Sequence, residues 1–112
     1  GMPPWSAQLD EHELLTAIQD FTDAEAERPG TSVVIGPPGL PGVMTPAAAK
    51  GLEFDAVLVV EPARILADGP HGAADLYVAL TRATQRLGIV HSAPLPRALA
   101  GLTTRSERVG HH

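Results

Sequence analysis

Apolar residues along the chain recur at spacings that distinguish predicted helices from predicted strands. From Ser6 to about Glu27 the spacing is helical, with Ser6 as the N-cap and Pro29-Gly30 as the stop. The apolar positions of this helix are Leu9, Leu14, Leu15, Ile18 and Phe21. A second helical pattern runs from Ala73 to about Arg86, where a core-facing stripe is formed by Leu76, Leu80, Ala83 and Leu87. We therefore expect two amphipathic helices.

Short apolar runs predict the strands. Thr31 to Ile35 is β-branched, and Ala56 to Val60 is apolar at every position, which is typical of a central parallel strand covered on both faces. Gly88 to His91 is expected to be the last strand. Glycines and prolines from Gly36 to Gly42 force a loop, and Val43 to Thr45 after it could be a brief strand. Short helical pieces are expected at Ala47–Gly51 and Ala63–Ala67.

This order of elements predicts an α/β domain with a mostly parallel sheet of four or five strands, flanked by helices. We place the domain at residues 6–99. Residues 1–5 are expected to be a tag scar and disordered start, because Gly1 before Met2 is typical of a cleavage remnant. Residues 100–112 have no periodicity, so we expect a disordered tail.

Composition narrows the class of protein. A length of 112 residues suits one small domain, and the absence of cysteine excludes disulfides and thiolate metal sites. Without a signal peptide or a run of roughly 20 apolar residues, a soluble cytoplasmic protein with no membrane contact is expected. The net charge of -5 argues against tight autonomous binding of nucleic acid. The histidines are scattered without zinc-ligand spacing, so no metal site is expected.

Charged residues cluster in two segments. In the first, Ala49–Asp55, Lys50 and Glu53 lie in a glycine-containing turn that leads into the apolar strand. It is not a phosphate-binding P-loop, because no G-x-x-x-x-G-K-[ST] sequence occurs in the chain. Taken alone, the segment is more readily a capped turn than a functional site.

The second segment, Leu76–Arg86, carries two arginines. Arg82 and Arg86 would be one helical turn apart and off the apolar stripe, so both guanidinium groups are expected to leave the core together. A planar guanidinium suits the oxygens of a transferring phosphoryl group. Arg86 could instead pair only with an acidic side chain, which is the role that we favour for it. A helix with two arginines is, by itself, more often a solvated face.

Together and in this order, Ala49-Lys50-Gly51-Leu52-Glu53-Phe54-Asp55 and Leu76-Tyr77-Val78-Ala79-Leu80-Thr81-Arg82-Ala83-Thr84-Gln85-Arg86 resemble motifs V and VI of superfamily 1 helicases of the UvrD, Rep and PcrA type. Those motifs lie on the second RecA-like motor domain, which closes over a nucleotide held mainly by the first. The resemblance implies the RecA-like fold of a second motor domain, complete or partial. It also implies ATP and Mg²⁺ in an assembled motor, neither bound tightly by this chain alone, and a partner domain bearing Walker A and B motifs.

The position of each residue within the helicase motifs implies its role. Arg82 corresponds to the arginine finger, Glu53 to the residue that contacts the ribose, and Gly51 to a point of close backbone approach. Thr45 and Lys50 lie where the family contacts single-stranded DNA, which we expect to bind weakly.

The chain departs from the family pattern at two places. Ala47 stands where the family usually has histidine, and no arginine follows the Thr31–Ile35 strand, where motif IV normally supplies one. The two segments are most similar to those of the helicase-IV-like HelD group, which acts on RNA polymerase. The resemblance thus implies the C-terminal motor-domain fragment of an ATP-dependent DNA helicase or HelD-like translocase. The alternative is a non-catalytic interaction module that binds a partner such as RNA polymerase.

Overall fold

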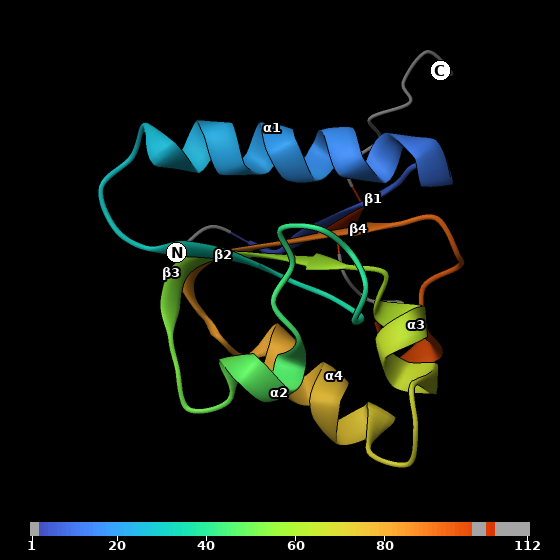
Figure 1. Ribbon diagram of the computed structural model, residues 1–112. Helices are drawn as coiled ribbons and strands as arrows, with labels where there is room; N and C mark the ends of the chain where they lie inside the picture. The colour runs from blue at the N-terminus through green and yellow to red at the C-terminus, as the bar shows by residue number, and fades with distance from the viewer. Residues whose placement is uncertain (1–2, 100–102, 105–112) are drawn as a thin grey trace.

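Five parallel strands in the order β2-β3-β4-β1-β5 form the middle layer of the computed structural model (Figure 1). The structure describes residues 3–99 and 103–104. The strands are β1 (Trp5–Gln8), β2 (Ser32–Ile35), β3 (Phe54–Val60), β4 (Ala83–His91) and β5 (Thr103–Thr104). The helices are α1 (Leu14–Ala26), α2 (Pro46–Ala49), α3 (Pro62–Ala67) and α4 (Gly72–Leu80), with 3-10 turns η1 (Glu11–Glu13) and η2 (Arg97–Leu99). The predicted α/β class, with a parallel sheet flanked by helices, is confirmed.

Helices cover both faces of the sheet, and this explains the unbroken apolar run of β3. Helix α1 lies over one face, while α2, α3 and α4 lie over the other (Figure 1). Along β3, Leu58 and Val60 point into the core under α1, whereas Val57 and Val59 point into the core on the opposite side. All four side chains are at most 1% exposed. The part of β3 that is buried on both faces, Ala56–Val60, has no position for a polar side chain, as the sequence predicted.

The segment between β2 and β3 is close to the prediction. The Gly36–Gly42 loop is present, and the expected short helical pieces are α2 and α3. The brief strand expected at Val43–Thr45 is reduced to one bridge, in which Met44 N donates to Val34 O at 2.8 Å and Gly36 N donates to Met44 O at 3.0 Å. The bridge occupies the outer edge of β2, whose backbone groups would otherwise have no strand partner on that side.

The predicted helix from Ser6 to Glu27 is wrong at its beginning. Trp5–Gln8 is strand β1, and Ser6 is a buried strand residue opposite Ile89 and not an N-cap. The helical part starts instead after Asp10, whose N–H donates to Glu13 Oε1 at 2.8 Å. Four residues are too few for periodicity to separate a strand from a helical turn, and pairing with β4 decides between them.

The predicted helix from Ala73 to Arg86 is also too long, because α4 ends at Leu80 and β4 begins at Ala83. Thr81 ends the helix by donating its hydroxyl hydrogen bond to Tyr77 O at 2.8 Å. Beyond it, the backbone pairs with β3 and replaces the helical hydrogen bonds with interstrand bonds. The strand expected at Gly88–His91 therefore starts five residues earlier, and it is not the last, because β5 follows it.

The domain boundaries can be compared with the described residues only in part. Trp5, in the predicted disordered start, belongs to β1, and Thr103–Thr104, in the predicted tail, form β5. Residues 1–2, 100–102 and 105–112 lie outside the described residues. Within the described part of the chain, no helix is long and apolar enough to cross a membrane.

Candidate functional site

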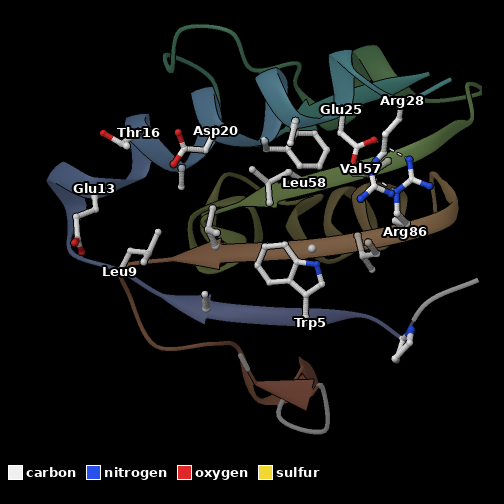
Figure 2. A pocket seen from close by; sticks show the side chains of 18 of the residues that line it. Trp5, Leu9, Glu13, Thr16, Asp20, Glu25, Arg28, Val57, Leu58 and Arg86 are labelled. Carbon is white, nitrogen blue, oxygen red and sulfur yellow. Dashed lines mark hydrogen bonds and ion pairs between the residues drawn. The ribbon is translucent and has the colours of Figure 1, made fainter. Parts of the chain in front are cut away.

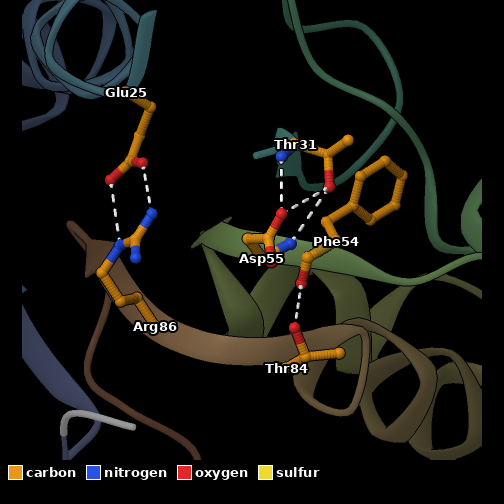
Figure 3. Close-up of polar contacts among 6 residues, drawn as sticks. All are labelled: Glu25, Thr31, Phe54, Asp55, Thr84 and Arg86. Atoms are coloured by element: carbon orange, nitrogen blue, oxygen red, sulfur yellow. Dashed lines mark hydrogen bonds and ion pairs between the residues drawn. The ribbon is translucent and has the colours of Figure 1, made fainter. Parts of the chain in front are cut away.

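The two charged segments meet at the amino-terminal edge of the sheet. Because β3 and β4 are parallel neighbours, the residues just before each strand lie at the same edge. Phe54 N donates to Arg82 O at 2.9 Å, and Thr84 Oγ1 donates to Phe54 O at 3.3 Å (Figure 3). The first segment is thereby joined to the second by backbone pairing, although 30 residues separate Phe54 from Thr84 along the chain.

Arg82 occupies the junction between α4 and β4, and its guanidinium lies against the first segment. Nη1 donates to Leu52 O at 3.2 Å, and Nη2 donates to Thr81 Oγ1 at 3.2 Å. The Nε atom is buried and has no hydrogen-bond partner. Nη1 and Nη2 each keep a second N–H, and a half-buried cation held by two contacts with donors to spare is suited to binding an anion.

The turn before β3 presents the residues that the family resemblance singled out. Gly51 has a φ of 83°, a conformation that glycine adopts without the steric penalty of other residues. It reverses the chain after α2 and leads into Leu52 and Glu53, both of which are exposed. Since the Leu52 carbonyl accepts from Arg82, the structure brings Gly51, Glu53 and Arg82 to one edge of the molecule.

Thr45 and Lys50, the expected nucleic-acid contacts, lie at the two ends of α2. Thr45 is the N-cap of this helix, and its Oγ1 accepts from Ala48 N at 3.3 Å. Lys50 is the exposed C-cap residue, next to Gly51. Lys50 is therefore near the turn described above, whereas the hydroxyl of Thr45 already satisfies a backbone donor of α2.

Arg86 does not accompany Arg82, so the expectation that both guanidinium groups leave the core together is wrong. A bulge between β3 and β4 sets Phe54 opposite Ala83 but Ala56 opposite Arg86, which inserts one extra residue into β4. Arg86 then reaches α1, where Nη2 donates to Glu25 Oε1 at 2.7 Å and Nε donates to Oε2 at 3.4 Å (Figure 3). The favoured role of Arg86 as the partner of an acidic side chain is confirmed.

The bond to Glu25 also affects the titration of Arg86. The hydrogen bond raises the pKa of the guanidinium above its usual value, the charges of Glu25 and Asp55 raise it further, and desolvation opposes them. Because the pKa is raised on folding, this contribution to stability is present throughout the range below the ordinary arginine pKa and is lost only as the pH rises above it. Arg86 is thus held in its charged form where it joins α1 to β4.

Asp55 has a structural role next to the site. Its Oδ2 accepts from Thr31 N at 2.7 Å and from Thr31 Oγ1 at 3.3 Å (Figure 3), and Asp55 N donates to Thr31 Oγ1 at 3.1 Å. These bonds hold the start of β2 against β3. Asp55 is therefore engaged in fixing the amino edge of the sheet and is not free for a ligand.

Two contributors to the site were not predicted, the hydroxyl of Thr81 and the carbonyl of Leu52. No sequence pattern identifies a backbone carbonyl as a partner of a distant arginine. Thr81 could have been suspected from its place directly before Arg82, but its role depends on where the helix ends, and the predicted helix ran past it.

One group of three potential metal ligands occurs among the described residues, formed by Asp10, His12 and Glu13. They lie in or next to η1, which follows the carboxyl end of β1, whereas Arg82 lies at the amino end of β4. The capping bond between Asp10 N and Glu13 accounts for the proximity of two of them. This group has no part in the Arg82 site.

The geometry defines an α/β domain with an arginine-bearing turn at the amino edge of a parallel sheet. Residues 43–90 match the family model of the UvrD-like helicase C-terminal domain, and this range includes the whole of the Arg82 site. The C-terminal domain of a possible DNA helicase from Lactobacillus plantarum WCFS1 has a similar structure, with a TM-score of 0.68 and 19% sequence identity over 95% of this chain and 85% of that chain. At that identity the likeness shows a shared fold. No curated protein sequence matches the chain significantly.

Proposed function

We propose that this chain is a C-terminal motor domain of a UvrD-like, ATP-dependent helicase or translocase. In this role it supplies an arginine finger and a ribose contact to an ATP site that a separate Walker-bearing domain completes. The contact that supports this best is the 3.2 Å hydrogen bond from Arg82 to Leu52 O, because it holds the guanidinium beside the turn that carries Glu53. The family match over residues 43–90 covers both groups.

Arg82 fits the chemistry of a phosphoryl group. Bound ATP would present phosphate oxygens, and the guanidinium keeps one N–H on each of Nη1 and Nη2 after its bonds to Leu52 and Thr81. Its partial burial reduces screening by water, and its position is set before any ligand arrives. A preorganised cation of this kind stabilises negative charge that grows in the transition state.

Glu53 and Gly51 fit the sugar end of the nucleotide. The exposed carboxylate of Glu53 can accept hydrogen bonds from ribose hydroxyls, and Gly51 lets the backbone turn without a side chain in the way. We assign Mg²⁺ and the main phosphate contacts to the Walker-bearing domain, since this chain has no P-loop sequence. Lys50, and less directly Thr45, would contribute weakly to binding of single-stranded DNA.

The test uses the chain combined with a Walker-bearing first motor domain to give an ATPase. Arg82→Ala should lower kcat by about 10² or more, and Arg82→Lys should restore little, because an ammonium group cannot make the forked contact. Glu53→Ala should mainly raise KM, since a ribose contact is similar in ground and transition states. Arg64→Ala, which removes an exposed arginine on α3, is the matched control and should leave both constants unchanged.

A second role is supported by the two departures from the family pattern. Ala47 replaces the usual histidine, and Gly36 and Pro37 follow β2 where an arginine is expected. Both changes fit a HelD-like module that binds a partner such as RNA polymerase without hydrolysing ATP. If Arg82→Ala leaves kcat unchanged but abolishes binding to RNA polymerase, this role replaces the catalytic one.

A further inference from the structure

An ion pair between α1 and β4 anchors the strand directly after the Arg82 site. Glu25 Oε1 accepts from Arg86 Nη2 at 2.7 Å, and the side chains of Glu25 and Arg86 are 10% and 24% exposed. In Figure 2 the two side chains meet at one end of a cavity of about 700 Å³ between α1 and the sheet. Glu25 lies outside residues 43–90, which match the family model. We propose that Glu25 and Arg86 are positioning residues that fix the strand register at Arg82.

The register needs an anchor because β4 contains a bulge. The pairing of β3 with β4 shifts by one position between Phe54 and Ala56. As a result, two residues of β4, Thr84 and Gln85, lie opposite the single residue Asp55. Both are exposed, although successive side chains of a regular strand point to opposite faces of the sheet. An extra residue of this kind can be removed if one strand slides by one position along the other.

Such a slide would displace Arg82. If the extra residue moved toward α4, Phe54 would pair with Thr84 in place of Ala83, and the start of β4 would shift by about 3.3 Å. The 2.9 Å bond from Phe54 N to Arg82 O would break, and the side chains at the start of β4 would exchange faces. The guanidinium would then lose its 3.2 Å bond to Leu52 O. The place of the bulge therefore sets the place of the guanidinium.

The ion pair holds the strand on the far side of the bulge. Arg86 is the first residue of β4 that returns to regular pairing, and its side chain is tied to a helix. A second bond, from Nε to Glu25 Oε2 at 3.4 Å, makes the contact forked and so fixes its orientation. Beside the pair the cavity separates α1 from the sheet, so apolar packing cannot replace the pair there. The extra residue is thus confined between two anchored points, Arg82 and Arg86.

Amide hydrogen exchange of the isolated chain, followed by NMR, tests the effect on register. The N–H of Phe54, which donates to Arg82 O, reports on the candidate site. The N–H of Glu61, which donates to Val90 O at 2.9 Å, reports on the opposite end of the β3–β4 pair. Comparison of the two amides separates a local change at the bulge from a general loss of stability.

Glu25→Ala removes the ion pair and should speed exchange at Phe54 by about threefold or more, with exchange at Glu61 unchanged. Asp23→Ala is the matched control, because it removes an exposed bond to Gln19 within the same helix. It should change neither amide. Equal acceleration at Phe54 and Glu61 in the Glu25 variant, or no acceleration at Phe54, would overturn the proposal.

The effect on catalysis rests on the proposed function and is measured in the ATPase assembled with a Walker-bearing domain. Glu25→Ala should lower kcat about fivefold with little change in KM, because a displaced guanidinium loses stabilisation of the transition state. Glu25→Gln keeps an acceptor for Arg86 and should lose less, and Asp23→Ala should lose nothing. An equal loss in the alanine variants of Glu25 and Asp23 would count against the proposal.

The two measurements fail separately. If Arg82→Ala leaves kcat unchanged, the proposed function is wrong, and the exchange at Phe54 still decides whether the ion pair sets the register. If Arg82→Ala lowers kcat but Glu25→Ala changes neither kcat nor the exchange at Phe54, the proposed function stands and the positioning role of Glu25 is wrong.

Discussion

At the residue scale, the position of Arg82 depends on Thr81. The Thr81 hydroxyl donates to Tyr77 O at 2.8 Å and accepts from Arg82 Nη2 at 3.2 Å, so one small side chain both ends α4 and supports the guanidinium. Thr81 is a positioning residue, because in the proposed site it touches Arg82 and not the nucleotide.

Replacing Thr81 with valine keeps the shape of the side chain but removes both hydrogen bonds. In the assembled ATPase, Thr81→Val should lower kcat by about tenfold with little change in KM, because the guanidinium would be less well placed for the transition state. Thr81→Ser should retain most of the activity, since it keeps the hydroxyl. Thr22→Val, an exposed change on α1, serves as the control. A purely structural role would be recognised by equal losses in the valine and serine variants.

At the element scale, the close approach of α3 and α4 sets the position of the helix that leads to Arg82. Gly72 is buried at the start of α4, and a Cβ there would lie 1.8 Å from the backbone oxygen of Leu66. A backbone carbonyl in a packed helix cannot move aside as a flexible side chain can. The absence of a side chain at Gly72 is therefore a requirement of this packing.

Gly72→Ala should lower the free energy of unfolding by about 1–3 kcal/mol, because the two helices must separate to admit the methyl group. Urea denaturation of the isolated chain measures this. Ala73→Ser changes the next, exposed residue and should alter stability by less than about 0.5 kcal/mol. An alanine at position 72 with wild-type stability would show that α3 and α4 can shift freely relative to one another.

At the scale of the whole molecule, the net charge of the chain and its lack of a P-loop sequence limit what it can do alone. Its net charge of -5 is unlike the basic balance of a domain that binds nucleic acid by itself, and it has no P-loop sequence to cradle phosphates. In the proposed function, the amino edge of the sheet, with Arg82 and Glu53, would supply only part of a nucleotide site. The proposed activity therefore requires a second domain.

The isolated chain should show no ATPase activity, and its dissociation constant for single-stranded DNA at physiological salt should exceed about 1 µM. A coupled ATPase assay and a fluorescence anisotropy titration measure the two properties. Turnover that is abolished by Arg82→Ala in the isolated chain would disprove the first expectation. Sub-micromolar DNA binding would disprove the second.

Elements whose residue types reflect their burial or backbone conformation were predicted correctly. Strand β3 has an apolar residue at every buried position, and the Gly36–Gly42 loop has residues that break regular structure. Segments whose apolar spacing fits both a helix and a strand were not predicted correctly. Trp5–Gln8 and Ala83–Leu87 fit a helix or a strand equally well over so few residues.

The sequence by itself determined the α/β class, the doubly buried strand and the two segments in which the candidate residues lie. Only the tertiary structure decided that α4 ends at Leu80, that Arg82 contacts Leu52 and that Arg86 contacts Glu25. The two arginine contacts depend on hydrogen bonds between residues far apart in sequence, 30 positions for Arg82 and Leu52 and 61 for Arg86 and Glu25. Local spacing carries no information about such partners, because strand pairing and the β3–β4 bulge set which side chains meet.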